Sequence, residues 1–186
     1  MQFDTKIAII IRTDLEAWQK LNVASFLAGG IAAASPECIG EAYEDGSGTQ
    51  YLSLIGQPIL VYGADRAALS RALERALARS VTPALYTEDM FKTTHDEANR
   101  AAVKAVARAD LNLVGLAVRA ERKVVDKIMD GLKFHAWLSA IVGKTAKARR
   151  RASVARTPKK PTSRMRELGA VPLVWILSMT DQSVIL

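Results

Sequence analysis

The sequence predicts a three-layer α/β/α domain built on a mixed, mostly parallel sheet of about four strands. Short apolar runs rich in β-branched residues, typical of strands buried on both faces, alternate along the chain with segments of helical spacing. Such an order places helices on both faces of one sheet. The chain has 186 residues, of which 49% are hydrophobic, so it is long enough to bury one sizeable core. We assign this domain to residues 1–137.

The first half of the domain is expected to hold two strands and two helices. The run Lys6-Ile7-Ala8-Ile9-Ile10-Ile11-Arg12 predicts the central strand, and a helix follows it. Turn signals in residues 35–58 predict a surface excursion with one hairpin. Residues 59–62 predict the second strand. Asp65 is then a suitable N-cap for a helix whose apolar face is formed by Leu69, Leu73, Ala76 and Leu77.

The second half repeats the alternation of strand and helix. It predicts a strand over residues 82–86, an alanine-rich helix from Thr94 to Ala109, a strand over 112–118 and a last helix from Glu121 to Leu132. Open sheets of this kind bind ligands beyond the carboxyl ends of their strands. The loops after Ile11 and Tyr86 are therefore where we expect a site.

The net charge of +7 belongs to the C-terminal end of the chain. Residues 1–140 hold 16 Lys/Arg and 17 Asp/Glu, whereas residues 141–186 hold 10 and 2. The segment from Lys144 to Arg166 is basic, with prolines and serines interspersed, and cannot bury enough apolar surface to order itself. We expect residues 138–186 to be a basic, flexible extension that could tether nucleic acid nonspecifically. An alternative is that this extension is an appended sequence without a selected function.

Several kinds of site and location are not supported by the sequence. Cys38, the one cysteine, cannot form an intramolecular disulfide, and the first residues lack the order of a signal peptide, which together predict a cytoplasmic protein. The apolar stretch from Gly169 to Met179 is shorter than the ~20 residues of a membrane-spanning helix. His95, His135 and Cys38 show no metal-ligand spacing, and no glycine-rich phosphate motif is present. We therefore expect neither a metal nor a cofactor.

Three blocks of the sequence resemble the peptidyl-tRNA hydrolase type II family. Arg12-Thr13-Asp14-Leu15 is similar to the turn after that family's first strand, Gly56-Gln57-Pro58 to the start of its second block, and Val125-Asp126-Lys127-Ile128 to its final helix. The order and spacing of the blocks agree over residues 6–133. The resemblance implies a peptidyl-tRNA hydrolase II-like fold.

A closer likeness is to a bacterial family of unassigned role, the domain of unknown function 2000 family. Asp14-Leu15, the segment from Trp18 to Val23, and Asp89-Met90-Phe91 stand in the same order in that family. It is itself considered a relative of the hydrolase. Membership implies the fold more directly than it implies the activity.

The resemblance to the hydrolase implies catalytic residues at Lys20, Asp89 and Thr93. In that family a lysine at the start of the first helix works with an Asp and a Thr four residues after it, and Asp89-x-x-x-Thr93 reproduces this spacing. Asp89 would take a proton from water, Lys20 would meet the developing negative charge, and Thr93 would orient the water. The family's second threonine falls on or beside Leu113, and the Gln and His of its first helix fall in residues 23–29, where neither occurs.

The sequence leaves two functions open. One is a divergent hydrolase that acts on an ester such as peptidyl-tRNA. The other is a non-catalytic module that binds a small-molecule ligand or a protein, in which Asp89 is a loop carboxylate that bonds nearby backbone amides. Across these two functions, the expected partner of the domain is tRNA or a small molecule. Hydrolases of the type II family are often dimeric, so the resemblance also allows a homodimer.

Overall fold

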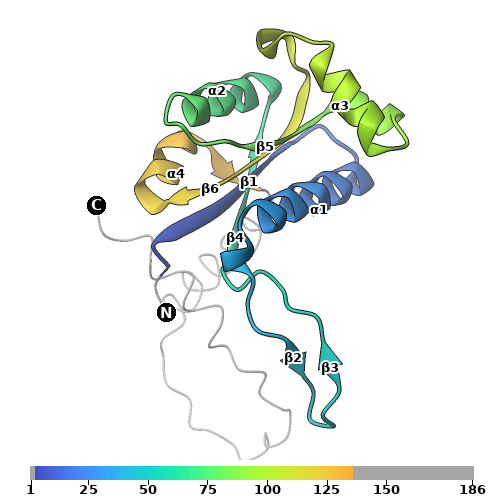
Figure 1. Ribbon diagram of the computed structural model, residues 1–186. Coiled ribbons are helices and arrows are strands. Elements are labelled where there is room, and N and C mark those ends of the chain that lie inside the picture. The colour runs from blue at the N-terminus through green and yellow to red at the C-terminus, as the bar shows by residue number, and fades with distance from the viewer. Residues whose placement is uncertain (1–2, 136–186) are drawn as a thin grey trace, which may run out of the picture. The chain divides into compact units, whose positions relative to one another are not determined.

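The computed structural model describes residues 3–135, and a five-stranded sheet lies at its centre (Figure 1). The order of the strands across the sheet is β5 (Ala84–Thr87), β6 (Leu113–Glu121), β1 (Thr5–Arg12), β4 (Ile59–Ala64) and β7 (Lys133–Phe134). β1 occupies the middle of the sheet, as its run of isoleucines predicts. The side chains from Ile7 to Ile11 are all buried.

The sheet is mixed, but the predictions of a mostly parallel sheet and of about four strands were wrong. β1 runs parallel to β4, whereas the pairs β1–β6, β5–β6 and β4–β7 are antiparallel. A continuous apolar run indicates burial on both faces of a sheet, yet it carries no information on the direction of the neighbouring strand. The fifth strand, β7, has two residues, which is too short for any period to be visible in the sequence.

Helices cover both faces of the sheet, so the predicted three layers are present (Figure 1). On one face lies α1 (Ala17–Ala34), and on the other lie α2 (Arg66–Leu77) and α4 (Arg122–Ile128). Two separate groups of buried side chains result, one on each side of the sheet. The α1 side buries Val23, Leu27 and Ile31. The α2 side buries Leu69, Ala72, Leu73 and Ala76 of α2 together with Val125 and Ile128 of α4.

Gly115 explains how closely α1 approaches the sheet. This residue lies in β6 under α1, and a Cβ atom at its position would stand 2.8 Å from Cδ1 of Leu27 and closer still to Val23. Real carbon atoms do not approach each other to this extent. The glycine at this position therefore allows Val23 and Leu27 to pack directly on the sheet.

The predicted surface excursion is a hairpin that projects from the body after the C-terminal end of α1 (Figure 1). A short 3-10 turn, η1 (Pro36–Cys38), leads into β2 (Tyr43–Glu44), which pairs antiparallel with β3 (Gln50–Tyr51). The base of the hairpin closes through backbone hydrogen bonds from Gly40 to Leu54 and from Gly56 to Cys38. We call residues 39–56 the arm.

The remaining elements lie between β5 and β6, and two helices are shorter than predicted. They are η2 (Glu88–Lys92), α3 (Asp96–Lys104) and η3 (Arg108–Asp110). The alanine-rich helix ends at Lys104 rather than Ala109, and the last helix, α4, ends at Ile128 rather than Leu132. The predicted flexible extension, residues 138–186, lies outside the described residues. Among the described residues, no helix is both long and apolar enough to cross a membrane.

Candidate functional site

The loops that the sequence singles out meet at one edge of the sheet. β1 and β4 are parallel and both end there, and β5 ends there too because it is antiparallel to β6, which in turn is antiparallel to β1. A cleft of about 310 Å³ lies at this edge. It is lined by Arg12, Thr13, Asp14, Asp65, Arg66, Glu88 and Asn112. We call this the carboxyl-edge cleft.

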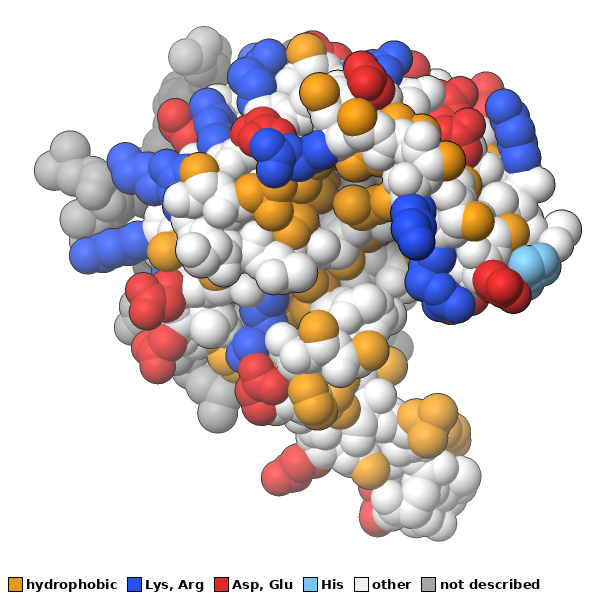
Figure 2. Space-filling view, turned by 45° about the horizontal axis from the view of Figure 1, so that its top comes forward, with side chains coloured by type: hydrophobic (Ala, Val, Ile, Leu, Met, Phe, Trp, Pro, Cys, Tyr) orange, Lys and Arg blue, Asp and Glu red, His pale blue; other side chains and the backbone are white. Residues whose placement is uncertain are grey.

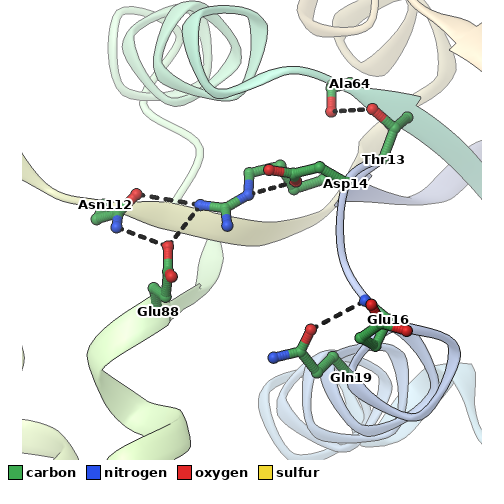
Figure 3. Close-up of polar contacts among 8 residues, drawn as sticks. Thr13, Asp14, Glu16, Gln19, Ala64, Glu88 and Asn112 are labelled. Carbon is green, nitrogen blue, oxygen red and sulfur yellow. Dashed lines mark hydrogen bonds and ion pairs between the residues drawn. The ribbon is translucent and has the colours of Figure 1, made fainter.

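Arg12 is the centre of the polar contacts in this cleft (Figure 3). Its Nε donates to Oδ1 of Asp14 at 2.7 Å, and its Nη1 donates to Oε2 of Glu88 at 2.9 Å and to Oδ1 of Asn112 at 3.1 Å. Nδ2 of Asn112 also donates to Oε2 of Glu88, at 2.8 Å. The Arg12 side chain is only 12% exposed. Three side chains therefore hold one guanidinium in a fixed place.

Charge pairing sets the protonation of this group of residues. Burial by itself would lower the pKa of Arg12, but the hydrogen bonds and charges of Glu88 and Asp14 outweigh it and raise the pKa above its ordinary value. The hydrogen bond from Arg12 is the largest cause that lowers the pKa of Glu88 below its ordinary value, against a smaller effect of burial. The pair is therefore ionised at neutral pH.

The backbone around the cleft is held by contacts of its own. The Thr13 amide donates to the Ala64 carbonyl at 3.0 Å and so ties the loop after β1 to the end of β4. Asp65 caps α2 by accepting from the Ala68 amide at 2.7 Å. At the start of α1, Oε1 of Gln19 accepts from the Glu16 amide at 2.9 Å (Figure 3). Each of these bonds satisfies a group that a strand end or helix end leaves open.

The charges that line the cleft nearly balance. Two arginines, Arg12 and Arg66, face three carboxylates, those of Asp14, Asp65 and Glu88, which gives a balance of −1. A phosphate backbone prefers a surface with an excess of positive charge. The lining therefore suits a neutral or zwitterionic polar ligand better than a nucleic acid.

The three residues that the hydrolase resemblance selects lie at the same edge, but none of them lines the cleft. Lys20 is half-buried in the first turns of α1, and Asp89 is exposed in η2. The two elements are joined by an edge-on contact between the rings of Trp18 and Phe91, with centroids 5.7 Å apart. The fold thus brings the helix that carries Lys20 into contact with the segment that carries Asp89.

Two observations weaken the hydrolase arrangement. The Thr93 hydroxyl donates to the Met90 carbonyl at 2.8 Å and is also in hydrogen-bond contact with Oδ1 of Asn99, so it already has local partners. Leu113, at or beside the position of the family's second threonine, is fully buried in the sheet. A buried leucine offers no hydrogen bond to a reacting group.

Sequence reasoning did not identify the carboxyl-edge cleft as a cluster of side chains. Glu88 and Asn112 lie 76 and 100 residues from Arg12 in the sequence, and no local pattern links residues so far apart. The available signal was the position of Arg12 at the end of one predicted strand and of Glu88 two residues after another. His95 caps α3, because its Nδ1 accepts from the Ala98 amide at 3.3 Å.

A second cleft, of about 370 Å³, lies at the opposite end of the sheet. Its lining includes Gln57 and Arg119, and Arg119 forms an ion pair with Glu37. The Nε atom of Arg119 is buried and has no hydrogen-bond partner within residues 3–135. A ligand could reach that atom only if the side chain moved, so this cleft is less preorganised for ligand binding than the carboxyl-edge cleft. No group of three His, Cys, Asp or Glu side chains in the described part of the chain is placed to hold a metal ion.

The comparisons with known proteins agree with the closer of the two resemblances. A solved structure of a protein of unknown function from Agrobacterium tumefaciens strain C58 is 50% identical, with a TM-score of 0.71. The match covers 72% of this chain and 99% of that one. No curated protein matches the chain. The family model described as "Protein of unknown function (DUF2000)" matches residues 5–136, and the chain therefore belongs to the DUF2000 family.

Proposed function

We propose that the carboxyl-edge cleft binds a small polar ligand that is neutral or zwitterionic. The observation that carries this proposal is the Arg12 guanidinium, which is nearly buried and already held by Asp14, Glu88 and Asn112. A group that is fixed before the ligand arrives loses little conformational freedom on binding. The balanced charge of the lining selects against polyanions.

The ligand's chemistry follows from the groups that face it. Guanidiniums donate hydrogen bonds and carboxylates accept them, so a ligand that carries both hydroxyl or amine donors and carbonyl or carboxylate acceptors satisfies this lining. Amino acids and nucleosides have this character. We propose that the ligand belongs to this class.

Nuclear magnetic resonance of the ¹⁵N-labelled full chain tests this proposal. Amino acids and the four ribonucleosides are added in turn, with inorganic phosphate as the anionic probe. We expect a member of the neutral or zwitterionic set to shift the signals of Arg12, Glu88 and Asn112, and the shifts to be lost in Arg12→Gln and kept in Arg71→Gln on the outside of α2. Shifts that survive Arg12→Gln, or no shifts with any probe, would contradict the proposal.

A second candidate function is ester hydrolysis, with the DUF2000 family as a divergent branch of the peptidyl-tRNA hydrolase type II superfamily and of its fold. The contact between Trp18 of α1 and Phe91 of η2 supports it, because Lys20 belongs to the same helix as Trp18, and Asp89 to the same 3-10 segment as Phe91. In this candidate Asp89 activates water and Lys20 stabilises the oxyanion.

Release of free tRNA from a peptidyl-tRNA mimic tests the second candidate. If the full chain turns over the mimic, Asp89→Asn and Lys20→Ala should each reduce the rate by 10²-fold or more, whereas the exposed Glu97→Gln should not. An inactive full chain, or activity that is unchanged in both variants, would reject hydrolysis and leave the ligand-binding proposal standing.

The chain's location and its C-terminal extension are also matters of proposal. The thiol of Cys38 is free and buried, which supports a reducing compartment such as the cytoplasm. We propose that the basic segment after residue 138 tethers nucleic acid nonspecifically. Truncation after residue 137 should then remove binding to a DNA duplex, and the affinity of the full chain should fall steeply with salt. Binding that survives truncation with a shallow salt slope would contradict the tether.

A further inference from the structure

The outer side of α1 is apolar although it faces away from the sheet. Trp18, Leu21 and Phe26 are 61%, 71% and 59% exposed. After Lys20 the next charged residue is Glu37, so the rest of the helix carries no charge. A surface helix normally turns charged residues to the solvent, and a helix that is apolar all round is normally covered. Within residues 3–135 the sheet covers one side of α1, and the rings of Trp18 and Phe26 also contact those of Phe91 and Tyr86.

The arm adds a second apolar surface that follows α1 directly. Figure 2 shows hydrophobic side chains along the hairpin that projects from the body. Leu52 and Leu54 are 89% and 62% exposed, and Tyr43 and Tyr51, which pair across the hairpin, are both about half exposed. An isolated two-stranded hairpin is marginally stable in water. An exposed apolar patch of this kind marks an interaction surface.

The tip of the arm is nevertheless well formed. Oδ1 of Asp45 accepts from the amides of Ser47 and Thr49 at 2.8 and 3.0 Å, and its Oδ2 accepts from the Tyr51 hydroxyl at 2.8 Å. The hydrogen bond from the Thr49 amide, followed by those from Tyr51 and Ser47, lowers the pKa of Asp45 to about 2. These hydrogen bonds therefore give the tip of the arm a defined conformation.

We propose that the outer side of α1 and the arm form the interface of a two-fold homodimer. The two copies of α1 pack antiparallel across the axis, near Ser25, and each arm lies along the other copy. In a two-fold interface the same surface serves both partners, so an uncharged helix face is complementary to itself.

The exposed apolar area is what such a dimer needs. The two surfaces carry eight large apolar side chains that are between 37% and 89% exposed, and at about 150–250 Å² for a large side chain they present roughly 900 Å² per copy. A standard interface buries about 800 Å² per partner. The eight are Trp18, Leu21, Phe26, Ile39, Tyr43, Tyr51, Leu52 and Leu54.

The two ends of this surface differ in charge. The arm carries Glu41, Glu44 and Asp45 and no Lys or Arg. The N-terminal half of α1 carries Lys20, and η2, which contacts it, carries Lys92 together with Glu88 and Asp89. When two α1 helices run antiparallel, the arm after the end of one helix lies beside the start of the other. Each acidic arm thus lies near Lys20 and Lys92 of its partner and also near the segment that carries Asp89.

Sedimentation velocity of the full chain tests the dimer. At tens of micromolar we expect the mass of two chains for the parent protein and of one chain for Leu21→Glu and for Leu52→Glu, because each places a charge at an apolar position that the interface buries. Arg71→Glu, on the outer side of α2, is the matched control and should remain dimeric. Circular dichroism should show the same folded spectrum for all four proteins. A monomeric parent, or a dimer that persists in both variants, would overturn the proposal.

A cysteine pair locates the axis. Ser25 and Ser70 are both helical serines whose hydroxyl donates to the carbonyl four residues earlier, one on α1 and one on α2. Under mild oxidation Ser25→Cys should form a disulfide between two chains, whereas Ser70→Cys and the parent protein, whose Cys38 is buried, should not. A stable dimer in which Ser25→Cys fails to cross-link would show that the copies meet through another surface and would reject this interface.

Discussion

The two helices α1 and α2 cover opposite faces of one sheet, and their inner sides are alike while their outer sides differ. Each turns a row of buried apolar residues to the sheet, centred on Leu27 in α1 and on Leu73 in α2. Outside, α2 shows charged residues such as Arg71 and Glu74, whereas α1 shows Leu21. The residues on the inner side of a helix suit the core on which they pack, and those on the outer side suit the solvent or protein that they contact. The difference indicates that α2 meets water and α1 meets protein.

The largest expected effect is the same on both inner sides. Leu27→Ala and Leu73→Ala each remove a nearly fully buried side chain, and each should lower the free energy of unfolding by about 2–5 kcal/mol. Denaturation by urea, followed by circular dichroism, measures the change. If one of the two substitutions costs less than about 1 kcal/mol, the two faces are not equivalent parts of one core.

A smaller effect is expected at Arg12, which stands on the α2 side of the sheet at the edge where β1 ends. Arg12→Gln leaves Glu88 and Asp14 without their cation, and we expect a loss of about 1–3 kcal/mol of stability. Arg71→Gln, an exposed arginine of α2, should stay within about 0.5 kcal/mol of the parent. Equal effects of the two substitutions in urea denaturation would show that the Arg12 contacts are no more than surface ion pairs.

The start of α2 offers a third and lesser test. The Asp65 side chain accepts a hydrogen bond from the Ala68 amide, and Asp65→Ala should cost about 1 kcal/mol. Asp65→Asn keeps an acceptor at the same place and should recover most of the loss. Thermal unfolding of the parent protein and of the two variants measures these differences in stability. If the asparagine variant is as unstable as the alanine variant, the cap is not the cause.

The smallest effect concerns pH. The pKa of Glu88 is lower in the folded protein than its ordinary value of 4.5, so its ionised form contributes stability above that value. This contribution is lost as the pH falls through the lower folded-state pKa. In Glu88→Gln the free energy of unfolding should therefore decrease less steeply as the pH falls below about 4.5. Near pH 7 its dependence on pH should be almost the same as in the parent protein. An unchanged slope below that pH would assign the acid sensitivity to other carboxylates.

The sequence predicted what depends on neighbours in the chain. The isoleucine run of β1, the cap at Asp65 and the hairpin within residues 35–58 are local signals, and each was found where expected. Strand direction was not predictable, because the apolar run of β6 looks the same whether β6 lies parallel or antiparallel to β1.

The candidate site divides in the same way. The loops after Ile11 and Tyr86 were chosen from the order of elements, and they do meet at one edge. The contacts of Arg12 with Glu88 and Asn112 depend on the pairing of β1, β5 and β6, so no spacing rule could show them. In the sequence, the outer side of α1 shows only as a helix without charge after Lys20, and its exposure became clear from the position of the sheet.

Hydrogen exchange of the full chain at two concentrations tests most directly whether α1 meets protein and α2 meets water. Mass spectrometry follows the amides of the arm, residues 39–56, of α1 and of α2, at about 0.1 and about 50 micromolar protein. We expect the arm and the outer side of α1 to exchange more slowly at the higher concentration, with α2 unchanged. Exchange in the arm that is independent of concentration, or a slowing in α2 equal to that in α1, would contradict the claim that α1 contacts protein and α2 contacts water.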